Sequence, residues 1–381
     1  MQERFFWQIR GKVQTVVAAI GLLVIGQSAL GAPVVQQISG TLNHKSTITI
    51  RGSGFGSKAT AAPLVWDDAS GSKLLDKWDG VWPTQLPGYN TGYYSPMRGI
   101  GLPHNHISHY IAGAHATNRG SDAGYNVAFW KNISLQPFPF DIYASWYQRA
   151  DDHWVFGQDN NYKTFAYSVC CNPYEMPHNW YLCYGPPHPG STTDTEQQWA
   201  IADDGESLMN PDVNGKNAWW SKAANPMGGK WAKVEVAIKV TNQTDGYVKV
   251  WEDGRLVVNY AGPTDKYAGN RRTIGIGGYA RDETPQNWRY FADAYVDTTL
   301  SRVVLANNPV LSQATVIENQ IPSKWSDASI TATVNLGRFA QGQSAYLFVV
   351  DSTGAPNATG LAVKAGASSG LPNPPGGVSV K

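Results

Sequence analysis

The sequence contains short runs in which apolar residues recur at every second position, and this period is what most restricts the fold. In the run from Trp231 to Val240 (WAKVEVAIKV), valine or isoleucine occupies every second position from Val234 onward, with charged residues or alanine between them. A second run, Tyr247 to Trp251, is followed by the hairpin turn signal E-D-G-R and by a third run, Leu256 to Tyr260. Because successive side chains of a strand face opposite sides, these runs predict antiparallel strands with a buried face.

Runs of this kind continue from Leu64 to roughly Asn307, separated by Gly, Pro, Asn and Asp, with no long stretch of helical periodicity. They predict an all-β fold, an antiparallel jelly-roll sandwich over residues 63–307. A charged content of only 15%, with 39 Gly, 19 Tyr and 15 Trp, suits an extracellular all-β protein with long loops. The formal net charge of +1 over 381 residues provides no field that would recruit nucleic acid or a membrane.

Two smaller β segments flank the predicted sandwich. Residues 32–62 contain the alternating strand T-I-T-I and the glycine-rich turn G-S-G-F-G, and they resemble the opening of IPT/TIG-type immunoglobulin-like repeats. Residues 308–365 contain three strand-like runs and predict a small C-terminal immunoglobulin-like (Ig-like) β domain. Residues 366–381 are rich in Gly, Ser and Pro, which predicts a flexible tail.

Residues 1–31 have the features of a secretory leader. Arg4, Arg10 and Lys12 form a basic region, residues 16–25 an apolar run, and Ala29-Leu30-Gly31 a small-x-small cleavage site. This pattern predicts a bacterial-type signal peptide and a mature protein that is secreted, periplasmic or at the cell surface. The apolar run is shorter than the ~20 residues of a membrane helix, so no membrane insertion is expected. The alternative is an uncleaved anchor.

Aromatic and polar side chains are concentrated between Asp141 and Gly185, in three strand-like runs. Sugar rings lie against aromatic faces, and their hydroxyls need amide, hydroxyl or charged partners, which predicts a polysaccharide groove here. The alternative is that half of these side chains pack in the core, as strand alternation requires. The residues predicted to bind substrate are Trp146, Tyr147, Lys163, Asn179 and Trp180.

The pattern W-x-K-V-E-V-x-I-K-V, then Y-V-K-V-W-x-D-G, then a closing strand F-A-D-A-Y-V-D at Phe291 to Asp297, resembles the concanavalin A-like lectin/glucanase jelly rolls. That superfamily includes laminin-G-like modules, carbohydrate-binding modules, family 16 glycosidases and jelly-roll polysaccharide lyases. The resemblance rests on strand rhythm across residues 63–307 and implies a polysaccharide partner. For a catalytic member it implies β-elimination from a uronic-acid polymer.

β-Elimination needs a group that neutralises the carboxylate, a base and an acid. The resemblance to lyases implies Arg149, Lys163 or Asn179 for the first role, one of His106, His109 and His153 for the second, and Tyr167 or Tyr181 for the third. The R-(S/T)-E-L and Q-I-H motifs of one alginate-lyase branch are absent. The E-x-D-x-(x)-E run that serves retaining hydrolysis in family 16 is absent as well.

Three cysteines, Cys170, Cys171 and Cys183, lie close together in the sequence. In an oxidising compartment one disulfide is expected, joining Cys183 to Cys171 or to Cys170. A bridge between the two adjacent cysteines and a thiolate metal site are the alternatives.

Two metal sites are also considered. The run P-H-N-H-I-S-H at 103–109 places two histidines two residues apart, which suits either a transition metal or substrate contact. Concanavalin A-like domains often carry a structural Ca²⁺ between the first and last strands. That resemblance implies a calcium site at Asp67, Asp68 and Asp293, whose oxygen ligands suit the ion.

A different class of function fits the same composition. Tyr/Trp-rich strands also serve protein–protein contact in a non-catalytic surface or matrix structural or adhesion protein. Such a protein would expose large aromatic patches and lack a cleft. The particular polysaccharide and the oligomeric state do not follow from the sequence.

Overall fold

The structure is a computed structural model that describes residues 31–70, 73–82, 93–96, 100–114, 125–133, 138–152, 162–168, 178–185, 197–202, 217–223, 228–265, 272–279, 288–366 and 368–369. In the described residues the regular elements are β-strands apart from two short 3₁₀ helices, η1 (Leu74–Asp76) and η3 (Leu311–Gln313). The predicted all-β antiparallel sandwich is confirmed. Among the described residues, no helix is long and apolar enough to cross a membrane.

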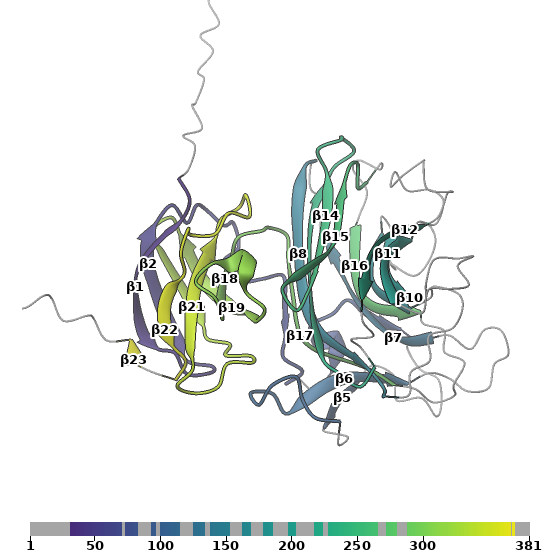
Figure 1. Cartoon of the computed structure of the whole chain (residues 1–381), viewed down its shortest axis with the longest axis horizontal. Helices are drawn as coiled ribbons and strands as arrows, with labels where there is room; N and C mark the ends of the chain where they lie inside the picture. Colours follow the sequence, from purple (N-terminus) through teal and green to yellow (C-terminus); the bar gives the residue numbers. More distant parts are fainter. Residues whose placement is uncertain are drawn as a thin grey trace, which may run out of the picture. The chain divides into compact units, whose positions relative to one another are not determined.

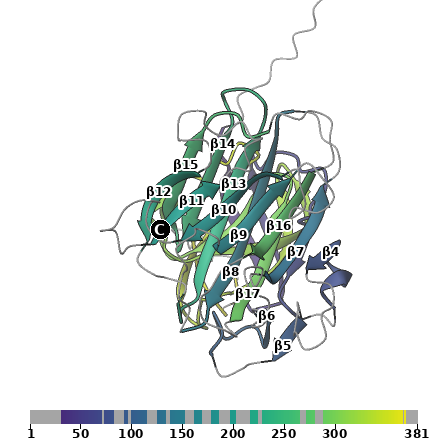
Figure 2. The ribbon, with the colours of Figure 1, turned by 90° about the vertical axis from the view of Figure 1, so that its right-hand side faces the viewer.

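Two antiparallel sheets form the central sandwich (Figure 1). We call them sheet A, in the order β15-β14-β13-β8-β17-β6-β5 with β3 beside β17, and sheet B, in the order β12-β11-β10-β9-β16-β7-β4. Figure 2 shows sheet B with this order running across the view. The strands of sheet A are β3 (Val65–Asp67), β5 (Tyr93–Pro96), β6 (His109–Ala114), β8 (Phe140–Ala150), β13 (Ala232–Val240), β14 (Tyr247–Glu252), β15 (Arg255–Ala261) and β17 (Trp288–Asp297). Those of sheet B are β4 (Gly80–Trp82), β7 (Tyr125–Ile133), β9 (Tyr162–Ser168), β10 (His178–Gly185), β11 (Gln197–Ala202), β12 (Asn217–Ala223) and β16 (Arg272–Tyr279).

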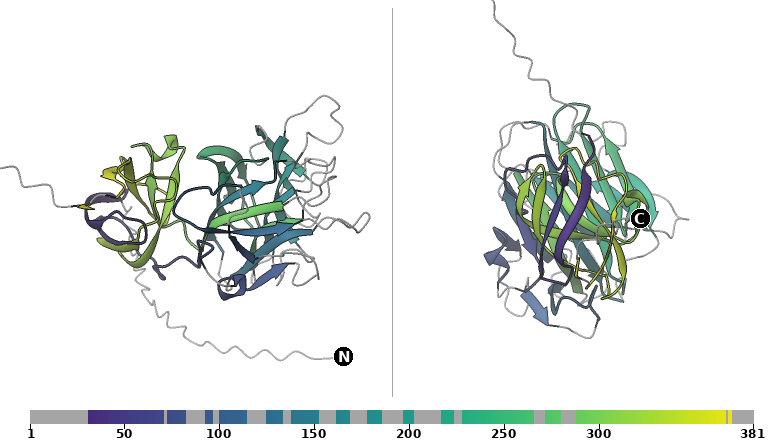
Figure 3. Two further views of the ribbon diagram at one scale, coloured as in Figure 1. Left: turned by 90° about the horizontal axis from the view of Figure 1, so that it is seen from below. Right: turned by 90° about the vertical axis from the view of Figure 1, so that its left-hand side faces the viewer.

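The first and last parts of the described chain form one further β unit, which we call the terminal domain. Figure 3 shows the purple N-terminal strands among the green and yellow C-terminal ones. Strand β2 pairs with β20, and Ile48, Ile50 and Phe55 share a core with Val303 and Leu347. The segments 32–62 and 308–365 thus complete each other, since neither alone has enough apolar residues to enclose a core. The strands are β1 (Val34–Thr41), β2 (Thr47–Ser53), β18 (Arg302–Ala306), β19 (Ile317–Ser326), β20 (Ser329–Thr333), β21 (Ser344–Val350), β22 (Leu361–Lys364) and β23 (Ser368–Ser369).

The core of the central sandwich lies between sheets A and B, and the alternating residues supply it. Val234, Val236 and Ile238 of β13 face Phe165, Ile274 and other apolar side chains of sheet B. Strands β8 and β13 are buried on both faces, whereas β14 is buried on one. A second layer must therefore cover the outer side of β8 and β13.

Candidate functional site

The outer face of β8 contacts the terminal domain. Tyr143, Ser145 and Tyr147 share this face and are almost wholly buried. The Tyr147 hydroxyl donates a hydrogen bond to Oε1 of Glu318, and Asn319 Nδ2 donates to Ser145 Oγ at 2.7 Å. The acceptor Glu318 and the donor Asn319 both belong to β19. The polar and aromatic face that suggested a sugar groove is thus occupied by the chain's own second domain, and Tyr147 is not available to a substrate.

Glu318 lies at the centre of this contact with no exposed surface. It accepts hydrogen bonds from Lys233 Nζ at 2.7 Å and from the backbone N–H of Arg338 at 3.0 Å, besides that from Tyr147. Burial opposes the ionisation of Glu318, but the nearby charge of Lys233 and its hydrogen bond to the carboxylate outweigh burial and lower the pKa of Glu318. Burial raises the pKa of Tyr147 well above its usual value, and the adjacent carboxylate of Glu318 adds to this effect. The contact is therefore built around one buried carboxylate.

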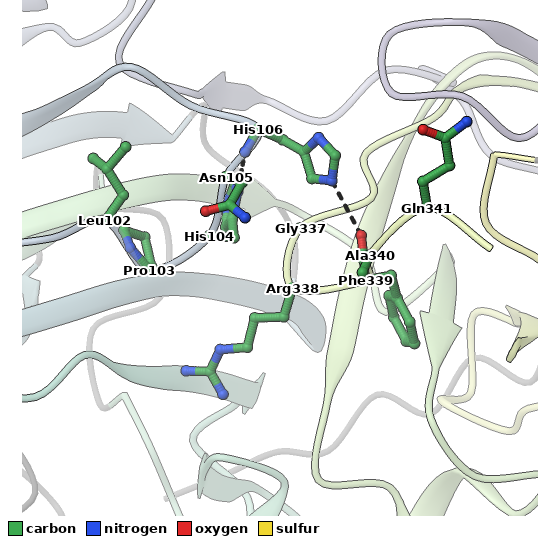
Figure 4. A pocket seen from close by; sticks show the side chains of 10 residues that line it. All are labelled: Leu102, Pro103, His104, Asn105, His106, Gly337, Arg338, Phe339, Ala340 and Gln341. Carbon is green, nitrogen blue, oxygen red and sulfur yellow. Dashed lines mark hydrogen bonds between the residues drawn. The ribbon is translucent and has the colours of Figure 1, made fainter. Parts of the chain in front are cut away.

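A cavity of about 380 Å³ lies beside this contact, between residues 102–106 and residues 337–341 (Figure 4). His106 points to the carbonyl of Phe339, with Nε2 3.1 Å from that oxygen, while Arg338 extends away from it. The ring of His106 stacks on that of His44, with centroids 4.8 Å apart. Burial, then the charge of His106, lowers the pKa of His44 to about 4. His44 therefore carries no charge at neutral pH.

His104 lies in the same loop and has a hydrogen-bond partner at each of its ring nitrogens. Its Nδ1 accepts a hydrogen bond from the backbone N–H of His106 at 3.3 Å, so its ring proton lies on Nε2, which is 2.8 Å from Oδ2 of Asp293. Asp293 also accepts from Asn335 of the terminal domain at 3.4 Å. These histidines thus fasten the 102–106 loop to its surroundings, and the described contacts are structural.

The candidate base and the candidate cation are not brought together. Arg149 is 8% exposed and donates to the carbonyl of Ile100 at 2.9 Å and to Asp152 at 2.6 Å. His109 begins β6, where Ser108 Oγ lies 2.8 Å from its Nδ1. Within the described part of the chain, no hydrogen bond joins Arg149 to His106 or His109. The third candidate base, His153, lies outside the described residues.

Trp146 and Tyr167 pack between the two sheets and have no exposed surface. The ring of Trp146 stacks on Phe165 with centroids 5.9 Å apart. The hydroxyl of Tyr167 donates to Asp265 at 2.9 Å, and Arg272 Nε donates to the same carboxylate at 2.8 Å. Burial, then Asp265, raises the pKa of Tyr167 well above its usual value. Both residues therefore stabilise the core, because alternation along their strands directs them inward.

The outer face of sheet B brings together other predicted residues. The strand register places Trp130, Gly275, Ala166 and Tyr181 in one row across β7, β16, β9 and β10. Lys163, which is partly exposed, lies opposite Cys183 and so two positions along β10 from Tyr181. Asn179 and Trp180 also belong to β10, but Trp180 is opposite Tyr167, which faces the core, so Trp180 is not part of this outer row. The side chains of these β10 residues lie outside the described part.

Asp67, Asp68 and Asp293 have partners of their own. Asp67 accepts hydrogen bonds from Lys77 at 3.1 Å and Trp78 at 2.8 Å, and Asp68 interacts with Lys77 and Ser70. Asp293 is bonded to His104 instead. Strand β3 does pair with β17, with Asp67 opposite Ala294. In the described ranges no three His, Cys, Asp or Glu side chains are grouped to hold a metal, and the calcium site stays a prediction.

The disulfide also stays a prediction, since Cys170, Cys171 and the side chain of Cys183 lie outside the described residues. We expect mass spectrometry under non-reducing conditions of the protein expressed with its predicted leader to find Cys183 in a bridge, because thiols in an oxidising compartment pair. Detection of three free thiols would contradict this expectation.

A second cavity, of about 450 Å³, escaped the sequence analysis. Tyr247, Lys249 and Trp251 of β14 line it, each partly exposed, together with Arg302 of β18. The alternating sequence Y-V-K-V-W could have indicated this cavity, because it places aromatic and cationic residues on the face of β14 opposite the core.

No protein-family model matches the chain, and no curated protein matches it. Among solved structures, it is similar to the endo-β-1,4-glucuronan lyase of the fungus Trichoderma reesei, with 14% identity and a TM-score of 0.44 over 62% of this chain and 96% of that one. It is also similar to the alginate lyase Aly36B, with 10% identity and a TM-score of 0.42 over 63% and 98% of the two chains. The carbohydrate recognition domain of Emp47p has 11% identity and a TM-score of 0.38 over 64% and 99%. Likenesses this weak carry no argument about activity.

Proposed function

We propose that this chain is an exported, carbohydrate-active β-sandwich protein that binds a polysaccharide on the outer face of sheet B. The proposal rests on the row in which Trp130 lies beside Gly275 and Ala166. Lys163 lies on β9, the strand that contains Ala166. Gly275 and Ala166 are small and buried, whereas Trp130 and Lys163 are partly exposed on this face. An aromatic ring at one side and a cation nearby supply the contacts that a sugar face and an acidic group require.

The position of Trp130 depends on its neighbour across the strand pair. Gly80 of β4 is opposite Trp130, and a Cβ added at Gly80 would come within 2.1 Å of the indole ring. Only glycine therefore fits there, and the ring packs directly on the backbone of β4. Trp130 is partly exposed in this arrangement. It is thus held in a fixed orientation, as a stacking platform must be.

The proposal extends to β-elimination on a uronic-acid polymer. Lys163 would neutralise the substrate carboxylate, and Tyr181 on the adjacent strand would supply the proton to the leaving oxygen. His109 lies on β6 of sheet A, and His106 contacts the terminal domain. Neither belongs to sheet B, so His153 remains the candidate base for a reaction there. The products would carry a C4–C5 double bond conjugated to the carboxylate and absorb in the near ultraviolet.

We expect Trp130→Ala to weaken polysaccharide binding about tenfold, because a buried aromatic contact is a typical binding hot spot. Affinity electrophoresis against alginate, glucuronan, pectate and glycosaminoglycans measures this, and ultraviolet absorbance of the products reports cleavage in the same panel. Lys163→Gln should remove any cleavage, since a neutralising cation acts mainly as charge develops in the transition state.

Lys324→Gln is the matched control for Lys163→Gln, because Lys324 is exposed on the terminal domain and its replacement removes the same single charge. Unchanged binding by folded Trp130→Ala protein would place the polysaccharide elsewhere. Binding without absorbance across the panel would make the chain a recognition module and remove the catalytic roles of Lys163 and Tyr181.

The structural or adhesion alternative gains no support from the described surface. The large apolar residues exposed there are all aliphatic, and the aromatic face of β8 is covered.

A further inference from the structure

The 450 Å³ cavity on the outer side of sheet A combines aromatic and cationic side chains in a way that a core would not. On β14, Val248 and Val250 face the core, while Tyr247, Lys249 and Trp251 alternate with them on the other side. Four residues along a strand correspond to about 13 Å, so the two rings stand apart with the ammonium group between them. The volume lies within the range of ordinary ligand pockets.

The two cations that line this cavity lack carboxylate partners in the described part of the chain. The ammonium group of Lys249 lies 5.1 Å from the centroid of the Tyr247 ring, and no ion pair forms there. Arg302 donates from Nη1 to the carbonyl of Leu300 at 2.9 Å, and its guanidinium group lies 4.1 Å from the Tyr143 ring. Its buried Nε–H finds no acceptor among the described residues. Lys249 therefore retains donors for an external acceptor, whereas the unpaired Nε–H of Arg302 is buried and Arg302 contributes its charge to the cavity.

Two other buried cations among the described residues differ in this respect, whereas Arg289, like Arg302, donates to backbone carbonyls and has a buried Nε without a partner. Lys233 is paired with Glu318 at 2.7 Å, and Arg272 with Asp265 at 2.8 Å. Among the described residues that line the cavity, the one carboxylate, Glu235, already accepts a hydrogen bond from the Tyr143 hydroxyl. Because neither Lys249 nor Arg302 has a carboxylate partner among the described residues, the cavity favours an anionic group brought in by a ligand.

We infer that this cavity is a second carbohydrate site, separate from sheet B, that binds a carboxylate-bearing sugar residue. The pyranose faces lie against Tyr247 and Trp251, and the carboxylate lies between Lys249 and Arg302. Ser312 and Thr353 line the cavity as well; the Thr353 hydroxyl donates to Asp351 and can accept a hydrogen bond from a sugar hydroxyl. The site would anchor an acidic polymer to the protein independently of any reaction at sheet B.

The first test is calorimetry of the full mature chain with short oligomers of glucuronate, with neutral cello-oligosaccharides and with sulfated oligosaccharides. Lys249→Gln and Trp251→Ala should each weaken binding of the glucuronate oligomer at this site about tenfold or more, through loss of a charged contact or a stacking face. Lys364→Gln on β22 removes an equal charge from an exposed position and should change nothing. Tyr247→Phe keeps the ring and should retain binding.

A second readout locates the ligand. Acetylation of lysines followed by mass spectrometry should show Lys249 protected by the glucuronate oligomer and Lys364 unprotected, in both the wild-type and the Trp130→Ala protein. Protection of Lys249 that disappears in Trp130→Ala would mean that the oligomer binds only at sheet B and would overturn the inference. Absence of protection in the wild type would overturn it too, whatever happens at sheet B. Protection by sulfated or neutral oligosaccharides alone would overturn the assigned sugar class.

Discussion

Replacing Lys233 with alanine should lower the free energy of unfolding by about 3–5 kcal/mol, the cost of leaving a buried carboxylate without its cation. Lys233 is the only cation within ion-pair distance of Glu318 among the described residues, and neither side chain is more than 7% exposed. The hydrogen bonds from Tyr147 and from the Arg338 backbone remain, but they carry no full positive charge to balance Glu318. Urea denaturation followed by tryptophan fluorescence measures the loss.

Two comparisons separate this effect from a general loss of lysine. Lys239→Ala removes a lysine paired with Asp245, whose side chain is 62% exposed, and should change stability little because water screens such pairs. The double variant Lys233→Met with Glu318→Leu should recover most of the loss, since no charge then stays buried. A loss no larger in Lys233→Ala than in Lys239→Ala would contradict the buried pair.

The effect of Lys233→Ala should also depend on pH in a defined direction. The pKa of Glu318 in the folded protein lies below its usual value of 4.5, so its contribution to stability is complete above that value. This contribution is lost as the pH falls through the folded-state pKa. The difference between wild type and Lys233→Ala should therefore be full at neutral pH and shrink in strong acid.

The strands could be predicted from the sequence because alternation is a local property. The run Trp231 to Val240 became β13 (Ala232–Val240), and Tyr247 to Trp251 became β14 (Tyr247–Glu252). The final strand extends from Trp288 rather than Phe291, since the buried Arg289 and Tyr290 continue its pairing with β8. Each strand carries its own signal, so no knowledge of distant residues was needed.

The role of the outer face of β8 could not be predicted in the same way. Tyr147 and its partner Glu318 are 171 residues apart, and Ser145 and Asn319 are 174 apart. An aromatic and polar face requires partners whether they come from a sugar or from another domain of the chain, and the strand itself is the same in both cases. The decision rests on β19, whose Glu318 and Asn319 gave no signal of contact with β8.

Replacing Glu252 with glutamine should remove a pH dependence from the stability of the sandwich. Glu252 faces the core beside Trp199, whose indole N–H donates to its Oε2 at 3.0 Å, while Oε1 is buried with no partner among the described residues. Arg255 is 3.9 Å away and 58% exposed, so it balances little of the charge. Burial, only partly opposed by the Trp199 hydrogen bond, raises the pKa of Glu252 to about 7 from 4.5.

The raised pKa fixes the direction of the effect. Between the two values the folded protein holds a proton that the unfolded chain has released, so the contribution of Glu252 to stability is greatest below pH 4.5 and is lost as the pH rises through 7. This rise in the pKa of Glu252 corresponds to a decrease of about 3 kcal/mol in the free energy of unfolding across that pH range. A glutamine amide brings two donors of its own into the site, so the quantity to compare is the change in unfolding free energy from pH 5 to pH 8. Glu252→Gln should not show this decrease in unfolding free energy, whereas the control Asp245→Asn, at an exposed position, should retain it. Equal pH profiles for the wild type and Glu252→Gln would show that Glu252 ionises without cost in the folded protein.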